Sequence, residues 1–489
     1  MEHESSAEEP FEEQGSEARR VLRRAADLAA DYLEGSERYR VSPAIEPGEV
    51  AARIAAEPPA QGEEWDAIFG DYQRLIEPNV THWNHPGFLA YFATTGSLPG
   101  VAAETLSAAL NVNAMLWSTA PAATELEERV CDWLRQMLEL PPLFAGHVND
   151  TASVSTLLAL AAARHRSMPE SRQRGLAGAP PMSVYCSDQA HSSVDKAMVT
   201  LGLGLDALRR VESDDRYRLR PDRLTEAIER DRAAGLLPIA VVATAGTTST
   251  TSIDPLRAVA EICHQQGLWL HVDAAYAGCA AICPEVRELL DGLEEADSIV
   301  LNPHKWLFVP VDCSVLLTRG YDALRAAFRR VPEYLRTDRA ETTDLMDLGI
   351  ALGRRFRALK LWMVIRRFGV EGLRAEIRRH LELARELAGW LDAEPGFELA
   401  APVPLSVVCM RAVPLNASPP AEELDRFNLE LIARVNRRGV IALSHTRLRG
   451  GVVVRVAIGN QRTGRRHVRA AFEQLRDEAA ALRTEWRSR

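Results

Sequence analysis

Two short segments of the sequence place a carboxylate and an amine where a ligand site is expected. The apolar stretch 268–272 leads into Asp273, and the apolar stretch 298–301 is followed closely by Lys305. In a parallel sheet the carboxyl ends of neighbouring strands open onto one crevice, where ligands bind. A lysine there can form a Schiff base, and a carboxylate can keep a ring nitrogen protonated. These are the two protein groups that pyridoxal phosphate requires. The alternative interpretation is a structural Asp–Lys ion pair.

Further polar residues begin a predicted helix or follow predicted strands. Thr151, Ala152 and Ser153 lie where a loop enters a helix, and the free N–H groups of a helix start can bind an anion. His191 follows a second strand in a polar loop, and Thr244 ends a third. Each also has a simpler explanation. Ser153 can be an ordinary helix cap, His191 a structural histidine, and Thr244 a hydroxyl that bonds to the backbone.

The elements that must position these residues alternate between about residues 126 and 319. Strands separated by helical crossovers favour an α/β fold, with a mostly parallel sheet covered by helices on both faces. The predicted strands are 182–187, 239–244, 269–272, 299–301 and 314–318, and the predicted helices are 125–140, 153–165, 222–231 and 255–266.

The chain beyond this region predicts a smaller α+β part, and the chain before it predicts helices. We expect an acidic, disordered tail at 1–15, a helical segment at 16–78, a large domain at 79–365 and a small domain at 366–489. A long amphipathic stretch leads into the small domain. The elements predicted there are the amphipathic stretch 352–390, strands 405–410, 440–443 and 452–458, and a closing helix 465–486.

Composition restricts the class of protein. The 489 residues carry a formal net charge of −10, which disfavours nucleic acid and anionic membranes as partners. No apolar run approaches the roughly 20 residues that span a bilayer, and the acidic N-terminus does not resemble a secretion signal. The seven cysteines are scattered and odd in number, so we expect no disulfide framework, no metal site and a cytoplasmic location.

A series of motifs follows in order from about residue 79 to about residue 458. They are THW at 81–83, AYF at 90–92, TELE at 124–127, DQAHSS at 188–193, HVDAAYAG at 271–278, NPHKW at 302–306 and GRRFR at 353–357. Together they resemble the group II pyridoxal-phosphate-dependent amino acid decarboxylases, and most closely the aromatic L-amino acid decarboxylases. The resemblance implies the PLP-dependent transferase fold type I (aspartate aminotransferase-like) and the cofactor pyridoxal 5'-phosphate. It also implies a homodimer with active sites at the subunit interface, in which segment 16–78 packs on the partner.

The resemblance assigns roles to residues of the predicted crevice. Lys305 would hold the cofactor covalently, since an enclosed site lowers the pKa of an amine from about 10.4 and makes it nucleophilic. Asp273 would pair with the ring nitrogen, His191 would stack over the ring, and Thr244 would lie near Asp273. The phosphate would be held by Ala152, Ser153 and His304, with Asn302 close by.

Tyr334 matches the tyrosine that, in this family, lies on a mobile loop and protonates the carbon that has lost carbon dioxide. Protonation gives an amine, whereas reaction with oxygen gives an aldehyde, and aldehyde-forming relatives carry phenylalanine at this position. Residues 329–343 are charged and short of large apolar side chains, as expected of a closing lid. We therefore predict that Tyr334 is a general acid. The alternative is an exposed loop aromatic.

The substrate pocket inferred from the resemblance is aromatic and lacks a cation, which disfavours an acidic substrate. Aromatic walls favour ring substrates, although the Trp83 and Phe92 side chains can also be ordinary core residues. Glycine at 353 accompanies indole substrates in plant relatives. The sequence departs from the family at Ala93, where proline is usual, and at Asp150, beside the phosphate site. The predicted wall consists of Trp83, Tyr91, Phe92, Thr94, Leu352 and Gly353, with Met115, in place of a common aromatic, reaching across from the other subunit.

The predicted activity is that of a carboxy-lyase, which converts an aromatic L-amino acid of the tryptophan, tyrosine, dihydroxyphenylalanine or phenylalanine type into its amine and carbon dioxide. One alternative is an aldehyde synthase on the same scaffold, and another is a decarboxylase of an acidic or sulfinic amino acid. A third, from a different class, is a binding protein that has kept the fold without catalysis. The joint presence of Lys305, Asp273, His191 and Tyr334 argues against this third alternative.

Overall fold

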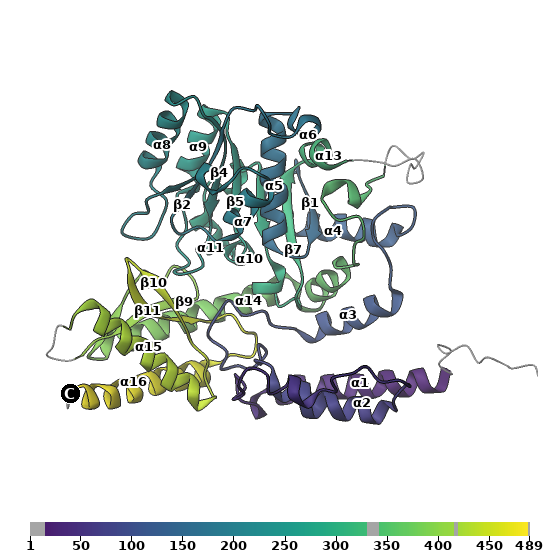
Figure 1. Cartoon of the computed structure of the whole chain (residues 1–489), viewed down its shortest axis with the longest axis vertical. Coiled ribbons are helices and arrows are strands. Elements are labelled where there is room, and N and C mark those ends of the chain that lie inside the picture. Colours follow the sequence, from purple (N-terminus) through teal and green to yellow (C-terminus); the bar gives the residue numbers. More distant parts are fainter. Residues whose placement is uncertain (1–14, 330–341, 415–418, 488–489) are drawn as a thin grey trace, which may run out of the picture. The chain divides into compact units, whose positions relative to one another are not determined.

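The computed structural model describes residues 15–329, 342–414 and 419–487 of the chain (Figure 1). Contacts within the chain divide it into two units, Met1–His85 and Pro86–Arg489. The domain boundaries predicted at 78 and 365 stay predictions.

The first unit contains α1 (Gly15–Gly35), α2 (Trp65–Asp71) and short irregular turns. The helical segment predicted to begin at residue 16 starts with α1, whose Val21 and Leu28 side chains are buried one above the other at a spacing of seven residues. Within this unit the His82 ring stacks on Tyr39 at 4.5 Å between centroids. The THW motif is therefore held against aromatic side chains.

The second unit is built on a seven-stranded sheet in the order β1-β7-β6-β5-β4-β2-β3. Five neighbouring strands, β2 to β6, run parallel to one another. β7 is antiparallel to both β6 and β1. The mostly parallel sheet predicted from the alternating pattern is thereby confirmed. The strands are β1 (Phe144–Asn149), β2 (Met182–Ser187), β3 (Leu208–Val211), β4 (Leu237–Thr244), β5 (Trp269–Asp273), β6 (Ser298–Leu301) and β7 (Ser314–Arg319).

Helices cover both faces of this sheet and produce two apolar cores. In Figure 1, α5 runs across the strands, and it packs with α7 and α13 against one face. On the other face α4, α8 and α9 pack against the strands, together with the first part of α14. The main helices of this part of the chain are α3 (Leu98–Leu110), α4 (Pro121–Met137), α5 (Ala152–Ser167), α7 (Ser193–Thr200), α8 (Pro221–Ala233), α9 (Leu256–Gln266), α13 (Asp322–Phe328) and α14 (Ala358–Ala393).

A four-stranded antiparallel sheet, in the order β10-β11-β9-β8, forms the C-terminal part with its own core. α15 and α16 pack together there (Figure 1), and α14 kinks at Gly369, where φ is +66°. The elements are β8 (Phe397–Leu399), β9 (Val407–Ala412), α15 (Ala421–Arg438), β10 (Ser444–Leu448), β11 (Gly451–Ala457) and α16 (Arg465–Arg487).

The strand predicted at 440–443 is wrong, because β10 begins only at Ser444. The backbone of Leu443 is bonded instead to the side chain of Asn436, which donates to its carbonyl oxygen and accepts from its N–H. Ala442 pairs with Phe88 in an isolated parallel bridge. These partners occupy the backbone groups that a sheet would need.

Among the described helices we find no apolar segment that could serve as a transmembrane span.

Candidate active site

The ends of three neighbouring parallel strands bring the predicted reactive groups together. Thr244, the last residue of β4, lies opposite Asp273, the last residue of β5. Asp273 in turn lies opposite Val300 of β6, and the Asn302 N–H just beyond β6 donates to the Ala275 carbonyl oxygen at 3.1 Å. The crevice that the sequence predicts at this edge of the sheet is therefore present.

This crevice holds a cavity of about 240 Å³. All eight residues predicted to bind the cofactor line it, as does one of the predicted substrate residues, Phe92. The described lining residues are Phe92, Thr151, Ala152, Ser153, His191, Thr244, Gly246, Thr248, Asp273, Ala275, Tyr276, Asn302, His304 and Lys305.

Lys305 extends from a short helix, α12 (Pro303–Trp306), and its Nζ lies 5.2 Å from the centroid of the Phe92 ring. Burial lowers the pKa of the Lys305 amine, and the nearby Asp273 carboxylate opposes that shift. Asp273 is buried and accepts a hydrogen bond of 3.1 Å from the Ala275 N–H. A lysine whose pKa is lowered, close to a fixed carboxylate, is the pair required for imine chemistry on a ring cofactor.

Two histidines that line the cavity use the same ring nitrogen as an acceptor. His191 Nδ1 accepts from the Ser193 N–H at 3.1 Å, and His304 Nδ1 accepts from the Cys313 N–H at 3.0 Å. Because Nδ1 is an acceptor in both rings, the proton of each neutral imidazole is on Nε2. Burial lowers the pKa of His191 and lowers that of His304 to about 3. Both histidines are therefore Nε2–H donors at neutral pH.

The start of α5 provides an anion site. Thr151, at the N-cap of this helix, has an extended backbone, and its side chain forms no capping bond. The Thr151 N–H donates to the Asp150 carboxylate at 2.6 Å. Asp150, which departs from the family pattern, therefore occupies one of the N–H donors of the loop. The N–H groups of the first helical turn, from Ala152 and Ser153, have no carbonyl partner within the helix. They can bind a phosphate.

Two buried polar atoms at the cavity have no hydrogen-bond partner among the described residues. They are Thr244 Oγ1 and Asn302 Oδ1. Buried polar atoms are normally paired, so an unpaired acceptor and hydroxyl beside a reactive lysine indicate a polar ligand. With the anion site at one end and Asp273 at another, the residues fit pyridoxal 5'-phosphate.

A stack of aromatic rings forms the wall behind Lys305. The rings of Phe92 and Tyr276 stack at 3.8 Å, and those of Tyr276 and Trp306 at 4.3 Å. Sequence reasoning did not assign Tyr276, Thr248, Gly246 or Ala275 to the site. Their position within a few residues after Thr244 or Asp273 was the available signal.

The other predicted substrate and lid residues lie outside the described lining of this cavity, and their roles stay predictions. Tyr91 and Leu352 are 59% and 51% exposed. Met115 packs against Leu116 and Met346. Thr94 and Gly353 are also absent from that lining. Trp83 belongs to the first unit, and Tyr334 lies outside the described residues.

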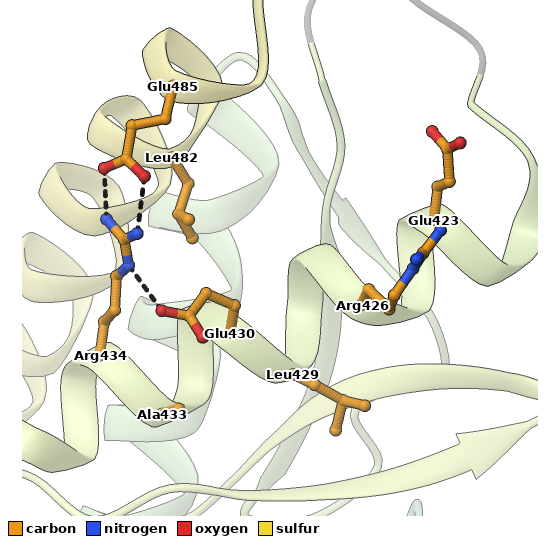
Figure 2. A pocket seen from close by; sticks show the side chains of 8 residues that line it. All are labelled: Glu423, Arg426, Leu429, Glu430, Ala433, Arg434, Leu482 and Glu485. Atoms are coloured by element: carbon orange, nitrogen blue, oxygen red, sulfur yellow. Dashed lines mark hydrogen bonds and ion pairs between the residues drawn. The ribbon is translucent and has the colours of Figure 1, made fainter. Parts of the chain in front are cut away.

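A larger hollow, of about 910 Å³, lies on α15 and α16 (Figure 2). Its Arg434 is bound by Glu485 through two hydrogen bonds of 2.7 Å and by Glu430 at 2.9 Å. The other described lining residues, Glu423, Arg426, Leu429, Ala433 and Leu482, include no lysine, histidine, cysteine or hydroxyl group. The reactive chemistry is therefore in the smaller cavity at the strand ends.

The fold and this cavity define a pyridoxal-phosphate enzyme of fold type I. The sequence model described as "Pyridoxal-dependent decarboxylase conserved domain" matches residues 47–413. The chain belongs to the pyridoxal-dependent decarboxylase family.

Similar proteins cover nearly the whole chain. Aromatic-L-amino-acid decarboxylase of Sus scrofa is 42% identical over 96% of this chain and 97% of its own. Phenylacetaldehyde synthase of Arabidopsis thaliana is 39% identical over 93% and 94%. The crystal structure of Oryza sativa TDC with PLP and tryptamine superposes with a TM-score of 0.93, at 36% identity over 97% of this chain and 99% of that one. The protein is a carboxy-lyase, and its cofactor is pyridoxal 5'-phosphate.

Proposed function

We propose that the enzyme decarboxylates an aromatic L-amino acid to the corresponding amine and carbon dioxide. The observation that carries the proposal is the wall of stacked rings, Phe92 on Tyr276, beside the Lys305 amine. Aromatic surfaces favour ring substrates. Lys305 is the single Lys or Arg in the described lining of the cavity, so an acidic side chain would find no cationic partner there. The names of the similar decarboxylases support the same substrate class.

The residues that line the cavity have different roles in the reaction. Lys305 is the amine that would hold the cofactor. Asp273 would stabilise a proton on the ring nitrogen. His304 and the first turn of α5 would hold the phosphate, and His191, a hydrogen-bond donor through Nε2, lines the same cavity. When bound, pyridoxal 5'-phosphate supplies a cationic ring that accepts the electrons released as carbon dioxide leaves.

We propose that the active form is a homodimer with active sites at the subunit interface, in which segment 16–78 packs on the partner. Met115 then contributes to the substrate pocket from across the interface. The exposure of Leu352, which is predicted to line the pocket, supports a pocket that a partner subunit completes. We also propose a cytoplasmic location, which agrees with the seven cysteines being free.

The substrate class can be tested by supplying tryptophan, tyrosine, dihydroxyphenylalanine, phenylalanine and glutamate separately and measuring the amine formed. We expect turnover of one or more aromatic substrates and none of glutamate. Lys305→Ala is the control. This variant should lose turnover and the visible absorption of covalently held cofactor, because no other described lining residue carries an amine. Preferential turnover of glutamate, or full activity of Lys305→Ala, would contradict the proposal.

The product can be tested at Tyr334, because the Arabidopsis relative is named an aldehyde synthase. In Tyr334→Phe the phenol that protonates carbon is missing, so amine formation should fall by about 10²–10⁴-fold, as expected for loss of a general acid. Aldehyde should increase, with consumption of oxygen and release of ammonia. Tyr321→Phe, a tyrosine whose hydroxyl donates to the Gly146 carbonyl oxygen, is the matched control. Normal amine formation by Tyr334→Phe would assign the proton to another group.

A further inference from the structure

Arg455, on β11, is a buried arginine that has no acidic partner among the residues that the structure describes. The residue is 4% exposed. Its Nε donates to the carbonyl oxygens of Thr248 at 3.0 Å and Ser249 at 3.3 Å, and its Nη1 donates to the carbonyl oxygen of Ala90 at 2.8 Å. Its Nη2 is buried and has no partner among the described residues. All of its hydrogen bonds are therefore to neutral backbone groups.

No carboxylate of the described residues neutralises this guanidinium. The acidic groups close enough to influence it are the Cys409 thiol and the phenols of Tyr276 and Tyr91. A thiol and phenols are neutral near pH 7, and burial raises the pKa of Cys409 and of Tyr276 further. A buried charge normally has a counter-ion, because an unpaired one is costly. The free energy that the buried, unpaired charge of Arg455 costs indicates that this charge has a function.

The Arg455 guanidinium and the Lys305 amine both lie close to the Phe92 ring. The Arg455 Cζ lies 4.8 Å from the centroid of the Phe92 ring, and Lys305 Nζ lies 5.2 Å from the same centroid. The two cationic groups are therefore no more than about 10 Å apart, and Arg455 is buried. At that separation and an effective dielectric constant of about 20, their repulsion changes a pKa by about one.

The hydrogen bonds of Arg455 connect the two segments that shape this part of the cavity. Thr248 and Phe92 both line it, and the guanidinium joins the carbonyl of Thr248 to that of Ala90, two residues before Phe92. We propose that Arg455 is a positioning residue, whose unpaired cation keeps Lys305 neutral and nucleophilic and whose hydrogen bonds fix Phe92 beside that amine. The inference rests on the proposed role of Lys305.

Among the described charged groups near Lys305, Arg455 is the one that lowers the pKa of its amine. Burial is the largest cause that lowers the pKa of Lys305, and Arg455 acts in the same direction. Asp273 and Cys279 raise the pKa. The remaining ionisable neighbours, His191 and His304, are uncharged at neutral pH for the reasons given above. Among the described residues Arg455 is thus the permanent cation that balances the attraction of Asp273 for a proton on Lys305.

The basicity of Lys305 can be measured directly, because the chain has three lysines, Lys196, Lys305 and Lys360. Full-length apoenzyme is acetylated with trace acetic anhydride between about pH 6 and about pH 11, a range that includes the ordinary lysine pKa. Mass spectrometry of the peptide that carries each lysine gives its rate. The exposed Lys196 serves as an internal reference. Cofactor and substrate are absent, so the result is independent of turnover.

Three variants separate charge from hydrogen bonding. Arg455→Met removes both, and we expect the pKa of Lys305 to rise by about one. Arg455→Lys keeps the charge and loses the fork of donors, so the pKa of Lys305 should remain near that of the wild type. Arg411→Met is the matched control, because Arg411 also lies in this sheet but is paired with Asp425. It should leave Lys305 unchanged.

An unchanged pKa of Lys305 in Arg455→Met would overturn the proposal. Equal rises in Arg455→Met and Arg455→Lys would also overturn it, because the effect would then come from lost hydrogen bonds. If Arg455→Met does not fold, Arg455→Gln is judged by the same criterion, since glutamine is neutral but keeps a donor for the backbone carbonyls. Failure here is distinct from failure of the proposed function, which Lys305→Ala tests through turnover and cofactor absorption.

Discussion

His147 shows how one residue can oppose the stability of the fold. It is fully buried on β1, and neither ring nitrogen makes a hydrogen bond of normal geometry with the described residues, although the Asn149 side chain is close enough to raise its pKa slightly. Burial lowers the pKa of His147 from its usual value near 6.5 to about 3. A buried polar ring without partners costs free energy at any pH. It costs more in acid, because the unfolded chain binds a proton that the folded chain does not.

His147→Leu should therefore stabilise the protein, by about 1–3 kcal/mol at pH 8 from removal of the unpaired polar atoms. The gain depends on pH. The pKa of His147 is lower in the folded state, so the stability of the wild type is complete above about pH 6.5 and falls as the pH drops toward 3. At pH 5 this adds about 2 kcal/mol to the advantage of the variant. Chemical denaturation at both pH values measures the two contributions.

His271→Leu is the matched comparison, because burial lowers the pKa of His271 to about 4, yet both of its ring nitrogens are hydrogen-bonded. Nδ1 lies 2.9 Å from Ser298 Oγ and Nε2 lies 3.3 Å from Thr156 Oγ1. Removing this ring leaves two buried hydroxyls with fewer partners, so His271→Leu should lose stability at pH 8. Destabilisation by His147→Leu at pH 8 would show that His147 has a partner in solution.

The secondary structure elements were predictable where one physical signal dominated. The predicted strand 182–187 coincides with β2, and the predicted helix 465–486 ends one residue before α16 does. Buried parallel strands are continuous apolar runs, and α16 has a regular helical period, so periodicity is sufficient for both. β1 was not predicted. Its sequence is interrupted by Gly146 and His147, and it gains its place by pairing with β7, which is distant in sequence.

The cofactor end of the candidate site was predictable for the same reason that the parallel strands were. Thr244, Asp273 and Asn302 lie at or just after strand ends, so finding the strands places these residues in one crevice. Arg455 gave no such signal. It lies inside β11 of the smaller sheet, and its relation to Lys305 arises from packing against segment 88–92 and loop 246–252. Local pattern carries no information about such contacts.

At the scale of the whole molecule, the second unit exposes a group of large apolar side chains on and near α3. Leu98, Leu106 and Leu110 are 69%, 53% and 60% exposed, and their spacing of eight and four residues puts them on one face of this helix. Val311 is also exposed nearby, next to Pro310, which lies against Gly100 of α3. Contiguous apolar surface of this kind marks an interface.

Leu106→Glu should weaken the proposed homodimer, because a charge at the centre of an apolar interface must be desolvated without a partner. We expect the dissociation constant of the dimer to rise at least about tenfold, which corresponds to about 1.4 kcal/mol. Activity should fall in parallel, since Met115 is proposed to complete the partner's pocket. Sedimentation velocity over a range of protein concentrations, with turnover measured on the same samples, follows both quantities.

Leu429→Glu is the control for this change, since Leu429 lies on α15 at the groove of Figure 2 and is 38% exposed. The same substitution there adds a charge to a surface already lined by Glu423 and Glu430 and should alter neither dimerisation nor turnover. If Leu106→Glu also remains a dimer with full activity, the apolar face of α3 does not form the interface. A dimer that persists while activity is lost would instead show that α3 acts within its own subunit, on the helix α14 against which it packs.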